Sequence, residues 1–197
     1  MNWWLAIRRV RASTIAVALL AAILVAVGGL AVTVPALFAV QGLALPVGLL
    51  APLIVSTSVS HGLARGDETT EAVAVRPIIL LDIGYAVVAA GVTLGVGAAL
   101  HWTGWSDLGI EAGRNGIGFI GLALIGRRTL GRNAGAVVPA VVALLLAFFG
   151  GDASGRPQWW AWIVTPPDDP RSWSFAVGFL VVGVCLSMGR TGRAHAA

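Results

Sequence analysis

The sequence predicts an all-α, polytopic integral membrane protein whose single domain occupies residues 1–197. The chain is 57% hydrophobic and 11% charged, whereas soluble domains carry about 25% charged residues. Several apolar segments approach the roughly 20 residues that a helix needs to cross a hydrocarbon core about 30 Å thick. All 13 basic residues are arginines, and most of them fall at the ends of these segments. These observations predict six transmembrane helices, placed at residues 14–34, 43–60, 77–100, 108–126, 133–150 and 173–188.

The amino-terminal segment, residues 2–11, combines indole and guanidinium side chains ahead of the first span. Its polar and aromatic residues are Trp3, Trp4, Arg8, Arg9 and Arg11. A helix of this composition lies in the membrane interface, with the indoles among the headgroups and the arginines toward anionic lipid. We therefore expect a short amphipathic helix here, with a plain polar flank of the first span as the alternative.

A charged connection, residues 61–76, separates the second and third spans. Asp67 is suited to cap a short helix that begins near Glu68. Pro46 and Pro52 fall inside the predicted second span, where each removes a backbone donor. We expect them to kink that helix, which neighbouring helices would then cover.

The fourth span is the least apolar of the six. Residues 117–126 are too few to cross a bilayer, and extension back to residue 108 adds Glu111 and Arg114. These two residues are three positions apart, so they share a helix face and can pair. Such a polar half is tolerated only where it faces the interior of a helix bundle.

The distribution of arginines favours six spans. If residues 108–126 cross the membrane, ten arginines lie on the side of the two termini and three lie on the other side. If they do not cross, the split becomes seven against six. Cytoplasmic surfaces carry the excess of arginine, so the first arrangement is preferred and both termini are expected in the cytoplasm.

Four polar side chains form a candidate intramembrane network: Asp82, Glu111, Arg114 and Asn115. A carboxylate inside a bilayer is costly unless it is paired. We expect Arg76 or Arg127 to be the partner of Asp82. A static ion pair and a member of a moving polar network are both compatible with this pattern.

The outer connection between the last two spans, residues 151–172, carries a cluster of tryptophans: Trp159, Trp160 and Trp162. A run this aromatic favours the membrane interface over water. We expect a short interfacial or re-entrant helix that ends at Pro166 and Pro167. A passive aromatic belt is the alternative.

The sequence lacks the common catalytic and metal-binding motifs. Without lysine, the Walker A pattern is impossible, and HExxH, CxxC and GxSxG are also absent. The three histidines fall at different predicted levels, and no metal site is expected. The net charge of +4 is explained by arginines that orient the helices, so no nucleic-acid partner is expected. Cys185 is the only cysteine, which excludes an internal disulfide.

This layout resembles the membrane subunit of ABC-2-type exporters, particularly small actinobacterial permeases. An amphipathic segment at residues 2–11 precedes six spans, and the loop at 65–76 corresponds to the coupling helix of that family. The outer segment at 158–169 corresponds to its extracellular re-entrant hairpin. The stretch GRNGIGFIGLALIGRR, residues 113–128, looks like the fourth span of such permeases.

The resemblance implies a multi-pass permease of the bacterial cytoplasmic membrane, as a homodimer or paired with a second permease. ATP and Mg²⁺ would bind to a separate ATP-binding cassette subunit, so this chain is not expected to be an enzyme or to hold a cofactor. Membrane lipid would be its other partner. A non-transporting membrane scaffold or an immunity protein of a resistance or biosynthetic cluster is the alternative. The residues that would couple the permease to the ATPase are Arg65, Asp67, Glu68, Glu71 and Arg76.

Overall fold

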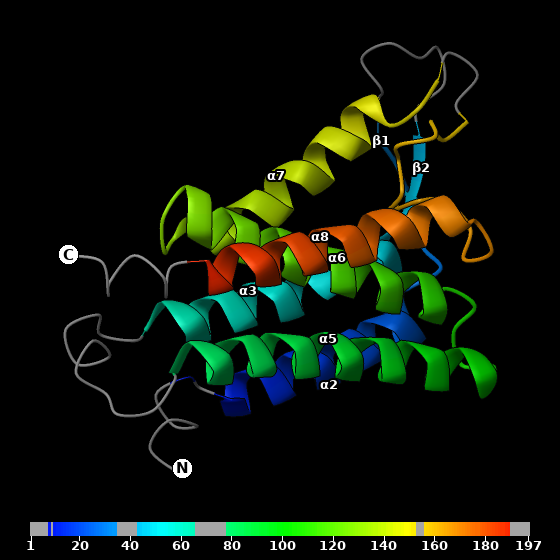
Figure 1. Cartoon of the computed structure of the whole chain (residues 1–197). Coiled ribbons are helices and arrows are strands. Elements are labelled where there is room, and N and C mark those ends of the chain that lie inside the picture. The colour runs from blue at the N-terminus through cyan, green and yellow to red at the C-terminus, as the bar shows by residue number, and fades with distance from the viewer. Residues whose placement is uncertain (1–7, 9, 35–42, 66–77, 153–155, 190–197) are drawn as a thin grey trace, which may run out of the picture.

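The computed structural model describes residues 8, 10–34, 43–65, 78–152 and 156–189. This part of the chain is mostly helical, with two short strands that the sequence did not predict (Figure 1). The elements are α2 (Val10–Ala26), β1 (Ala31–Val34), β2 (Leu43–Pro46), the 3₁₀ helix η1 (Val47–Leu49), α3 (Pro52–Ala64), α5 (Ile78–Trp102), α6 (Gly109–Thr129), α7 (Ala134–Phe149) and α8 (Pro170–Met188).

The helices form an elongated bundle in which α2, α3, α5, α6 and α8 run side by side and α7 is inclined to them (Figure 1). Successive helices alternate in direction. We call the end where α2 begins and α8 ends the terminal end, and the opposite end, which carries β1 and β2, the hairpin end (Figure 1).

Helix α6 is the centre of the bundle and packs against α3, α5, α7 and α8. Of its 21 residues, 15 are buried, including Phe119 and Ile120. A helix that is covered on all sides needs no apolar stripe facing lipid. Its glycines and polar residues are therefore tolerated because other helices surround them.

Glycines let the neighbouring helices approach α6 closely. A Cβ on Gly97 of α5 would overlap the backbone carbonyl of Gly109, and a Cβ on Gly109 would overlap that of Gly97. A Cβ on Gly121 would overlap the backbone of α8 at Phe179 and Leu180. Small residues at such crossings allow the extended van der Waals contact that holds membrane helices together.

The first predicted span, residues 14–34, is wrong in its second half. Helix α2 ends at Ala26, and residues 31–34 form β1, which pairs antiparallel with β2 from Ala31 opposite Pro46 to Val34 opposite Leu43. Gly28 and Gly29 follow the helix, and the β-branched Val32, Thr33 and Val34 favour an extended backbone. An apolar run that is read only for hydropathy cannot separate these two conformations.

The second predicted span, residues 43–60, is also corrected. Pro46 ends β2, and Pro52 begins α3 in its first turn, where its missing N–H costs nothing. Neither proline kinks a helix. Pro139, in contrast, does lie inside α7. The other predicted spans agree with α5 to α8 to within a few residues at each end.

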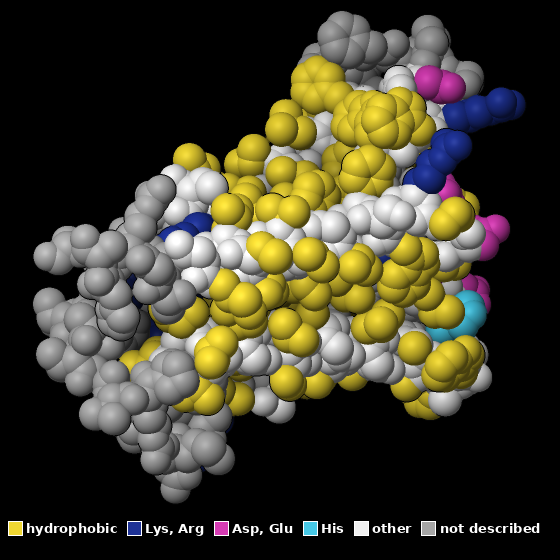
Figure 2. All heavy atoms as spheres, in the orientation of Figure 1, with side chains coloured by type: hydrophobic (Ala, Val, Ile, Leu, Met, Phe, Trp, Pro, Cys, Tyr) yellow, Lys and Arg dark blue, Asp and Glu magenta, His cyan; other side chains and the backbone are white. Residues whose placement is uncertain are grey.

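Three segments of the described chain are long and apolar enough to cross a membrane: Val47–Ala64, Ile78–Trp102 and Pro170–Met188. Helices α2 and α7 are apolar but shorter. The face of the bundle in Figure 2 carries many hydrophobic side chains between its two ends, and Val88 of α5 and Val181 of α8 are exposed in the chain by itself. The structure thus has the features of a membrane protein, whereas six crossings remain a prediction.

Candidate functional site

Two centres of buried charge lie at opposite ends of the bundle. Each is built around an arginine that is almost inaccessible: Arg8 is 1% exposed and Arg114 is 0% exposed. A guanidinium removed from water must recover its lost hydrogen bonds and electrostatic stabilisation inside the protein. The two centres do so with different partners.

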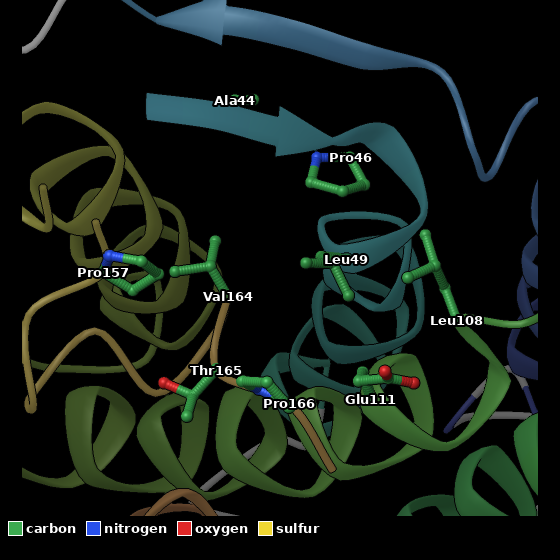
Figure 3. Close-up of a pocket in the computed structure, with 9 residues that line it drawn as sticks. All are labelled: Ala44, Pro46, Leu49, Leu108, Glu111, Pro157, Val164, Thr165 and Pro166. Atoms are coloured by element: carbon green, nitrogen blue, oxygen red, sulfur yellow. The ribbon is translucent and has the colours of Figure 1, made fainter. Parts of the chain in front are cut away.

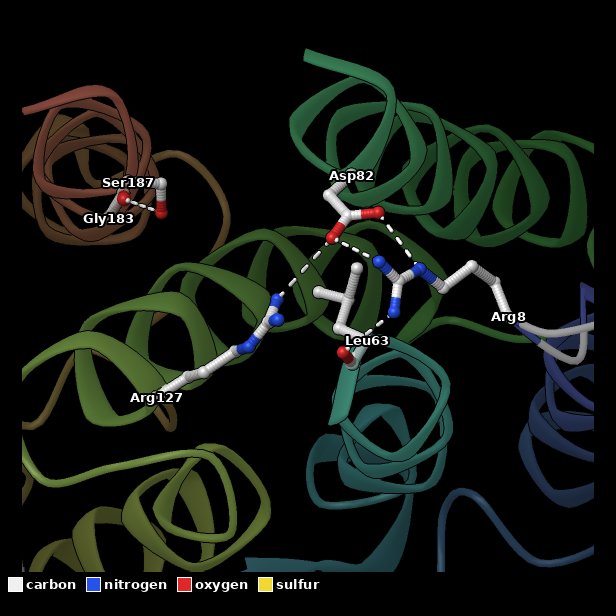
Figure 4. Close-up of polar contacts among 6 residues, drawn as sticks. All are labelled: Arg8, Leu63, Asp82, Arg127, Gly183 and Ser187. Carbon is white, nitrogen blue, oxygen red and sulfur yellow. Dashed lines mark hydrogen bonds and ion pairs between the residues drawn. The ribbon is translucent and has the colours of Figure 1, made fainter. Parts of the chain in front are cut away.

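The first centre is the terminal ion-pair network, formed by Arg8, Asp82 and Arg127 (Figure 4). Arg8 donates from Nε to Oδ1 of Asp82 at 3.0 Å and from Nη2 to Oδ2 at 2.9 Å. This parallel arrangement is the bidentate geometry that gives arginine–carboxylate pairs their strength and direction. Arg8 also donates from Nη1 to the carbonyl oxygen of Leu63 at 3.1 Å.

Arg127 approaches the same carboxylate from α6, with its Nη1 atom 3.8 Å from Oδ2 of Asp82. The expectation that Arg127 is a partner of Asp82 is therefore confirmed, and Arg76 lies outside the described residues. Sequence reasoning missed Arg8, the closer partner. Its position in a cluster of three arginines on the predicted cytoplasmic side was a signal, but hydropathy cannot show which arginine folds back over α5.

The terminal ion-pair network joins four parts of the chain: the segment ahead of α2, the last turn of α3, the first turns of α5 and the last turns of α6. The backbone of Arg8 lies directly on α3, because a Cβ on Gly62 would overlap the Arg8 carbonyl. Ser13 of α2 extends these links by hydrogen bonds to the hydroxyls of Ser58 and Tyr85. A displacement of α3 or α5 at this end would therefore also act on α2 and α6 through these contacts.

The second centre is the carbonyl cage, a set of oxygen atoms that surround the guanidinium of Arg114. Arg114 projects from α6 toward the non-helical segment between α7 and α8. It donates to the carbonyl oxygens of Trp162 at 2.7 Å, Ile163 at 3.4 Å, Thr165 at 3.0 Å and Pro166 at 3.2 Å, to Oγ of Ser172 at 2.6 Å and to Oδ1 of Asn115 at 3.1 Å.

Asn115 completes the carbonyl cage from the same helix. Its Nδ2 atom donates to the carbonyl oxygens of Ile163 at 2.9 Å and of Leu49 at 3.2 Å, so the side chain bridges the outer segment to η1. Backbone that is neither helix nor sheet is tolerated at membrane depth only where protein groups satisfy it. Arg114 and Asn115 supply the donors that this segment requires.

The tryptophans of the outer segment divide between surface and interior. Trp159 is 67% exposed, whereas Trp162 is 2% exposed and packs against Phe119 at 5.6 Å and Phe179 at 5.9 Å between ring centroids. Trp160 is half-buried. The expected short helix does not form, since residues 156–169 consist of turns and irregular backbone. Trp162 therefore belongs to the core of the bundle.

The predicted ion pair between Glu111 and Arg114 is also wrong. Arg114 points at the carbonyl cage, and neither oxygen of Glu111 is within ion-pair distance of it; Oε2 is buried without a hydrogen-bond partner. Helical spacing placed both side chains on one face, but the carbonyls of a segment about 50 residues away offered the guanidinium more acceptors. The charges of Glu111 and Asp169 still act on Arg114 through space.

Glu111 instead lines a pocket of about 290 Å³ at the hairpin end (Figure 3). The other lining residues come from β2, η1, the start of α6 and the outer segment; they are Ala44, Pro46, Leu49, Leu108, Pro157, Val164, Thr165 and Pro166. Most of these side chains are apolar. The pocket is adjacent to the carbonyl cage because Thr165 and Pro166 contribute to both.

The remaining predicted site residues are only partly described. Arg65 is exposed directly after α3, while Asp67, Glu68, Glu71 and Arg76 lie outside the described residues, as does most of the predicted amphipathic segment at 2–11. Within the described ranges, no group of three or more His, Cys, Asp or Glu side chains could hold a metal ion.

Comparison with known proteins identifies no relative, because no family model, curated protein or solved structure matches the chain. The class of protein therefore rests on the fold and on the two buried centres. In the described residues they define a mostly helical protein with three helices long and apolar enough to cross a membrane and a charged centre near each end of the bundle.

Proposed function

We propose that this chain is the membrane-spanning subunit of an ATP-driven exporter of the ABC-2 type, which works with a separate ATP-hydrolysing subunit. One observation carries the proposal. The terminal ion-pair network links the last turn of α3 to the first turns of α5, and these two helices flank residues 66–77, which hold most of the predicted charged loop 61–76. A partner that grips this loop would act on both helices at once.

The distribution of charge supports a cytoplasmic position for this loop in a bacterial inner membrane. At the terminal end, the described chain carries Arg8, Arg11, Arg65, Arg127, Arg128 and Arg132. The hairpin end carries the buried Arg114 and the exposed Arg156 and Arg171. This asymmetry has the sign of the positive-inside rule, and it agrees with six crossings and two cytoplasmic termini.

The two buried centres suggest how movement would pass through the bundle. Displacement of the loop by the ATPase would act on the terminal ion-pair network, and α6 would carry the movement from Arg127 at one end to Arg114 at the other. The carbonyl cage ties the outer segment to α6, so that segment would follow the helix. Two copies of the chain, or one copy and a second permease, would enclose the path between them.

The experiment that tests this function is purification of the full chain from its native membrane with any ATPase that accompanies it. The triple variant Asp67→Arg, Glu68→Arg and Glu71→Arg is expected to lower the copurified ATP hydrolysis by about tenfold, because opposite charges at an interface cost several kcal/mol when reversed. The control reverses two exposed acidic residues at the hairpin end, Asp107 and Asp168, and should leave the activity within about twofold.

Transport is then measured in inverted vesicles, with ATP and the partner present or absent. A wild-type chain that never associates with an ATPase would contradict the proposal and favour a non-transporting scaffold or immunity protein. Loss of ATPase activity in the hairpin-end control, but not in the triple variant, would place the partner on the wrong side of the membrane.

A further inference from the structure

The sheet formed by β1 and β2 presents one open edge at the hairpin end of the bundle. Ala31, Val32 and Thr33 of β1 are all exposed, and among the described elements β1 packs chiefly on β2. Strand β2 differs, because it also contacts α7 and ends in Pro46, which has no N–H to offer to a further strand. The edge of β1 is therefore the side of this sheet that can accept another strand.

The pairing of β1 with β2 fixes which backbone groups face the open edge. The N–H of Val47 donates to the carbonyl oxygen of Leu30 at 2.9 Å, and Pro46, which lies opposite Ala31, has no N–H to donate. Hydrogen-bonded and non-hydrogen-bonded residue pairs alternate along an antiparallel ladder. Ala31 and Thr33 therefore belong to the non-hydrogen-bonded pairs, and their N–H and C=O groups point away from β2.

No charged residue of the surrounding sequence protects this edge. Natural proteins shield their edge strands with charged side chains, with proline or with a covering element. The nearest charged residues along the chain are Arg11 and Arg65, so the whole stretch between them is uncharged. Leu30 and Val32 are 62% and 56% exposed. An open edge with these side chains is suited to pairing with another strand.

The depth of β1 in the membrane makes an unpaired edge costly. In the proposed exporter α2 crosses the membrane, and its 17 residues span about 26 Å, which is less than the roughly 30 Å of a hydrocarbon core. The strands that follow α2 then begin at the outer boundary of that core, where lipid offers no hydrogen bonds and open sheet edges do not occur. This step rests on the proposed function, because it takes α2 as a crossing helix.

We propose that β1 pairs antiparallel with β1 of a second copy of this chain, so that the two copies share one four-stranded sheet. Both strands of the sheet run across the long axis of the bundle (Figure 1). A two-fold axis along the membrane normal therefore sets one β1 antiparallel to the other. Val32 faces Val32 of the second copy, and Ala31 faces Thr33. In this register each Ala31–Thr33 pair exchanges both of its N–H···O bonds.

A second copy meets the requirements of this edge. A sheet of only two strands is marginally stable, whereas three or more strands can form a stable sheet. The added strand must be extended, uncharged and at the same depth as β1, and β1 of another copy satisfies all three conditions. The pairing selects a homodimer among the arrangements that the exporter function allows.

Disulfide formation tests this register directly. Val32→Cys, in a Cys185→Ser background, is treated in native membranes with copper–phenanthroline, which oxidises two adjacent thiols to a disulfide. In the proposed register the Cα atoms of the two introduced cysteines lie about 4.5 Å apart, within the range of a disulfide. Leu30→Cys is the matched control, because Leu30 is slightly more exposed than Val32 but its two copies lie about 14 Å apart. Val32→Cys should form the covalent dimer at least about tenfold faster.

A second measurement introduces no cysteine. Thr33→Pro removes an N–H that points to the open edge and takes no part in pairing with β2, so the fold of each copy is retained. Copies labelled at Cys185 with a donor or an acceptor dye report dimers in lipid vesicles by energy transfer. Thr33→Pro should weaken dimerisation by about tenfold, because each copy loses one hydrogen bond between the β1 strands. Thr33→Val keeps the N–H and should dimerise like wild type.

Equal disulfide formation in Val32→Cys and Leu30→Cys would overturn the proposal. A wild-type chain that stays monomeric in vesicles would also overturn it, and so would energy transfer that Thr33→Pro leaves unchanged. If lipid or a peptide of another protein covers the edge instead, neither cysteine variant will form a covalent dimer of this chain.

These outcomes can be separated from a failure of the exporter function. All of the measurements on β1 are made without ATP or an ATPase, so the pairing can be observed in a chain that transports nothing. A chain that copurifies with an ATPase but shows no contact between β1 strands would keep the exporter function and lose only this interface.

Discussion

The bundle buries two arginines to the same degree and stabilises them in different ways. Arg8 faces the carboxylate of Asp82 in a bidentate ion pair. Among the described residues, Arg114 has no carboxylate within ion-pair distance, and it is held mainly by backbone carbonyl oxygens. The described partners of Arg8, the Asp82 carboxylate and the Leu63 carbonyl oxygen, lie on regular helices, whereas the partners of Arg114 belong mostly to a segment without regular helix or sheet.

The difference shows what each arginine does for the fold. The terminal ion-pair network is a link between elements that would exist without it, since α3, α5 and α6 satisfy their own backbones. The carbonyl cage gives an irregular segment its conformation, because the oxygens of that segment have few other donors. Both side chains of the Arg8–Asp82 ion pair can be replaced together by apolar ones. Replacement of Arg114, in contrast, leaves the buried oxygen atoms of the carbonyl cage without their donor.

The largest effect is expected for Arg114→Lys, which keeps the charge and removes the planar fork of donors. A lysine can reach only about half of the present acceptors. At least two or three buried oxygens would lose their donor, at about 1–3 kcal/mol each, so the free energy of unfolding should fall by about 5 kcal/mol. Thermal unfolding of the detergent-solubilised chain, followed by tryptophan fluorescence, measures the loss.

Arg171→Lys is the matched control for this change, because Arg171 is exposed at the same end of the bundle. We expect it to unfold like wild type. If Arg114→Lys were as stable as this control, the positive charge alone would explain how Arg114 stabilises the fold. The planar set of donors would then not distinguish Arg114 from Arg8.

The second effect concerns the terminal ion-pair network. Asp82→Leu removes the carboxylate that Arg8 binds in a bidentate pair and should lower the free energy of unfolding by about 4 kcal/mol. The double variant Arg8→Met with Asp82→Leu should recover most of that loss, because two apolar side chains of similar size replace a buried ion pair at little net cost. The same unfolding measurement compares the single and double variants.

Asp168→Leu, a change at an exposed carboxylate, controls for the general effect of replacing Asp by Leu. A double variant as unstable as Asp82→Leu would show that Arg8 is needed for more than its ion pair. In that case Arg8, like Arg114, would be required for the conformation of its surroundings, and the proposed difference between the two arginines would be wrong.

The smallest effect is expected for Arg127→Gln. The side chain of Arg127 is 23% exposed, and its Nη1 atom lies 3.8 Å from the Asp82 carboxylate that Arg8 already binds at 2.9 Å. Partly exposed ion pairs of this kind contribute less than about 1 kcal/mol. The change in melting temperature should be small and should shrink further in high salt, since the remaining interaction is screened. A loss as large as that of Asp82→Leu would make Arg127 an equal partner.

Hydropathy located most helices but misjudged the first two predicted spans. The regions 78–102, 109–129, 134–149 and 170–188 are helical close to where they were predicted. The apolar run around β1 and β2 has the same hydropathy as a helix would have, but its glycines and β-branched residues allow strand pairing. The paired residues are 9 to 15 positions apart, so the pairing is not visible in a reading of either segment by itself.

The residues of the candidate site were predicted, but of their partners only Arg127 was. Asp82, Arg114 and Asn115 are all buried and hydrogen-bonded, as expected of polar residues inside a bundle. The closer of the two arginines described at Asp82 is Arg8, 74 residues away, and most partners of Arg114 are backbone oxygens about 50 residues away. Spacing on one helix suggested Glu111 for Arg114, because it is the only pairing that a local pattern can display.

The sequence by itself determined which stretches leave water and which polar residues must be covered, because the cost of exposing apolar groups or burying charge belongs to each residue type. Only the tertiary structure decided how that cost is met. Whether a buried guanidinium contacts a carboxylate or a set of carbonyl oxygens depends on which distant segments pack beside it. That packing cannot be read from the residues near it in the sequence.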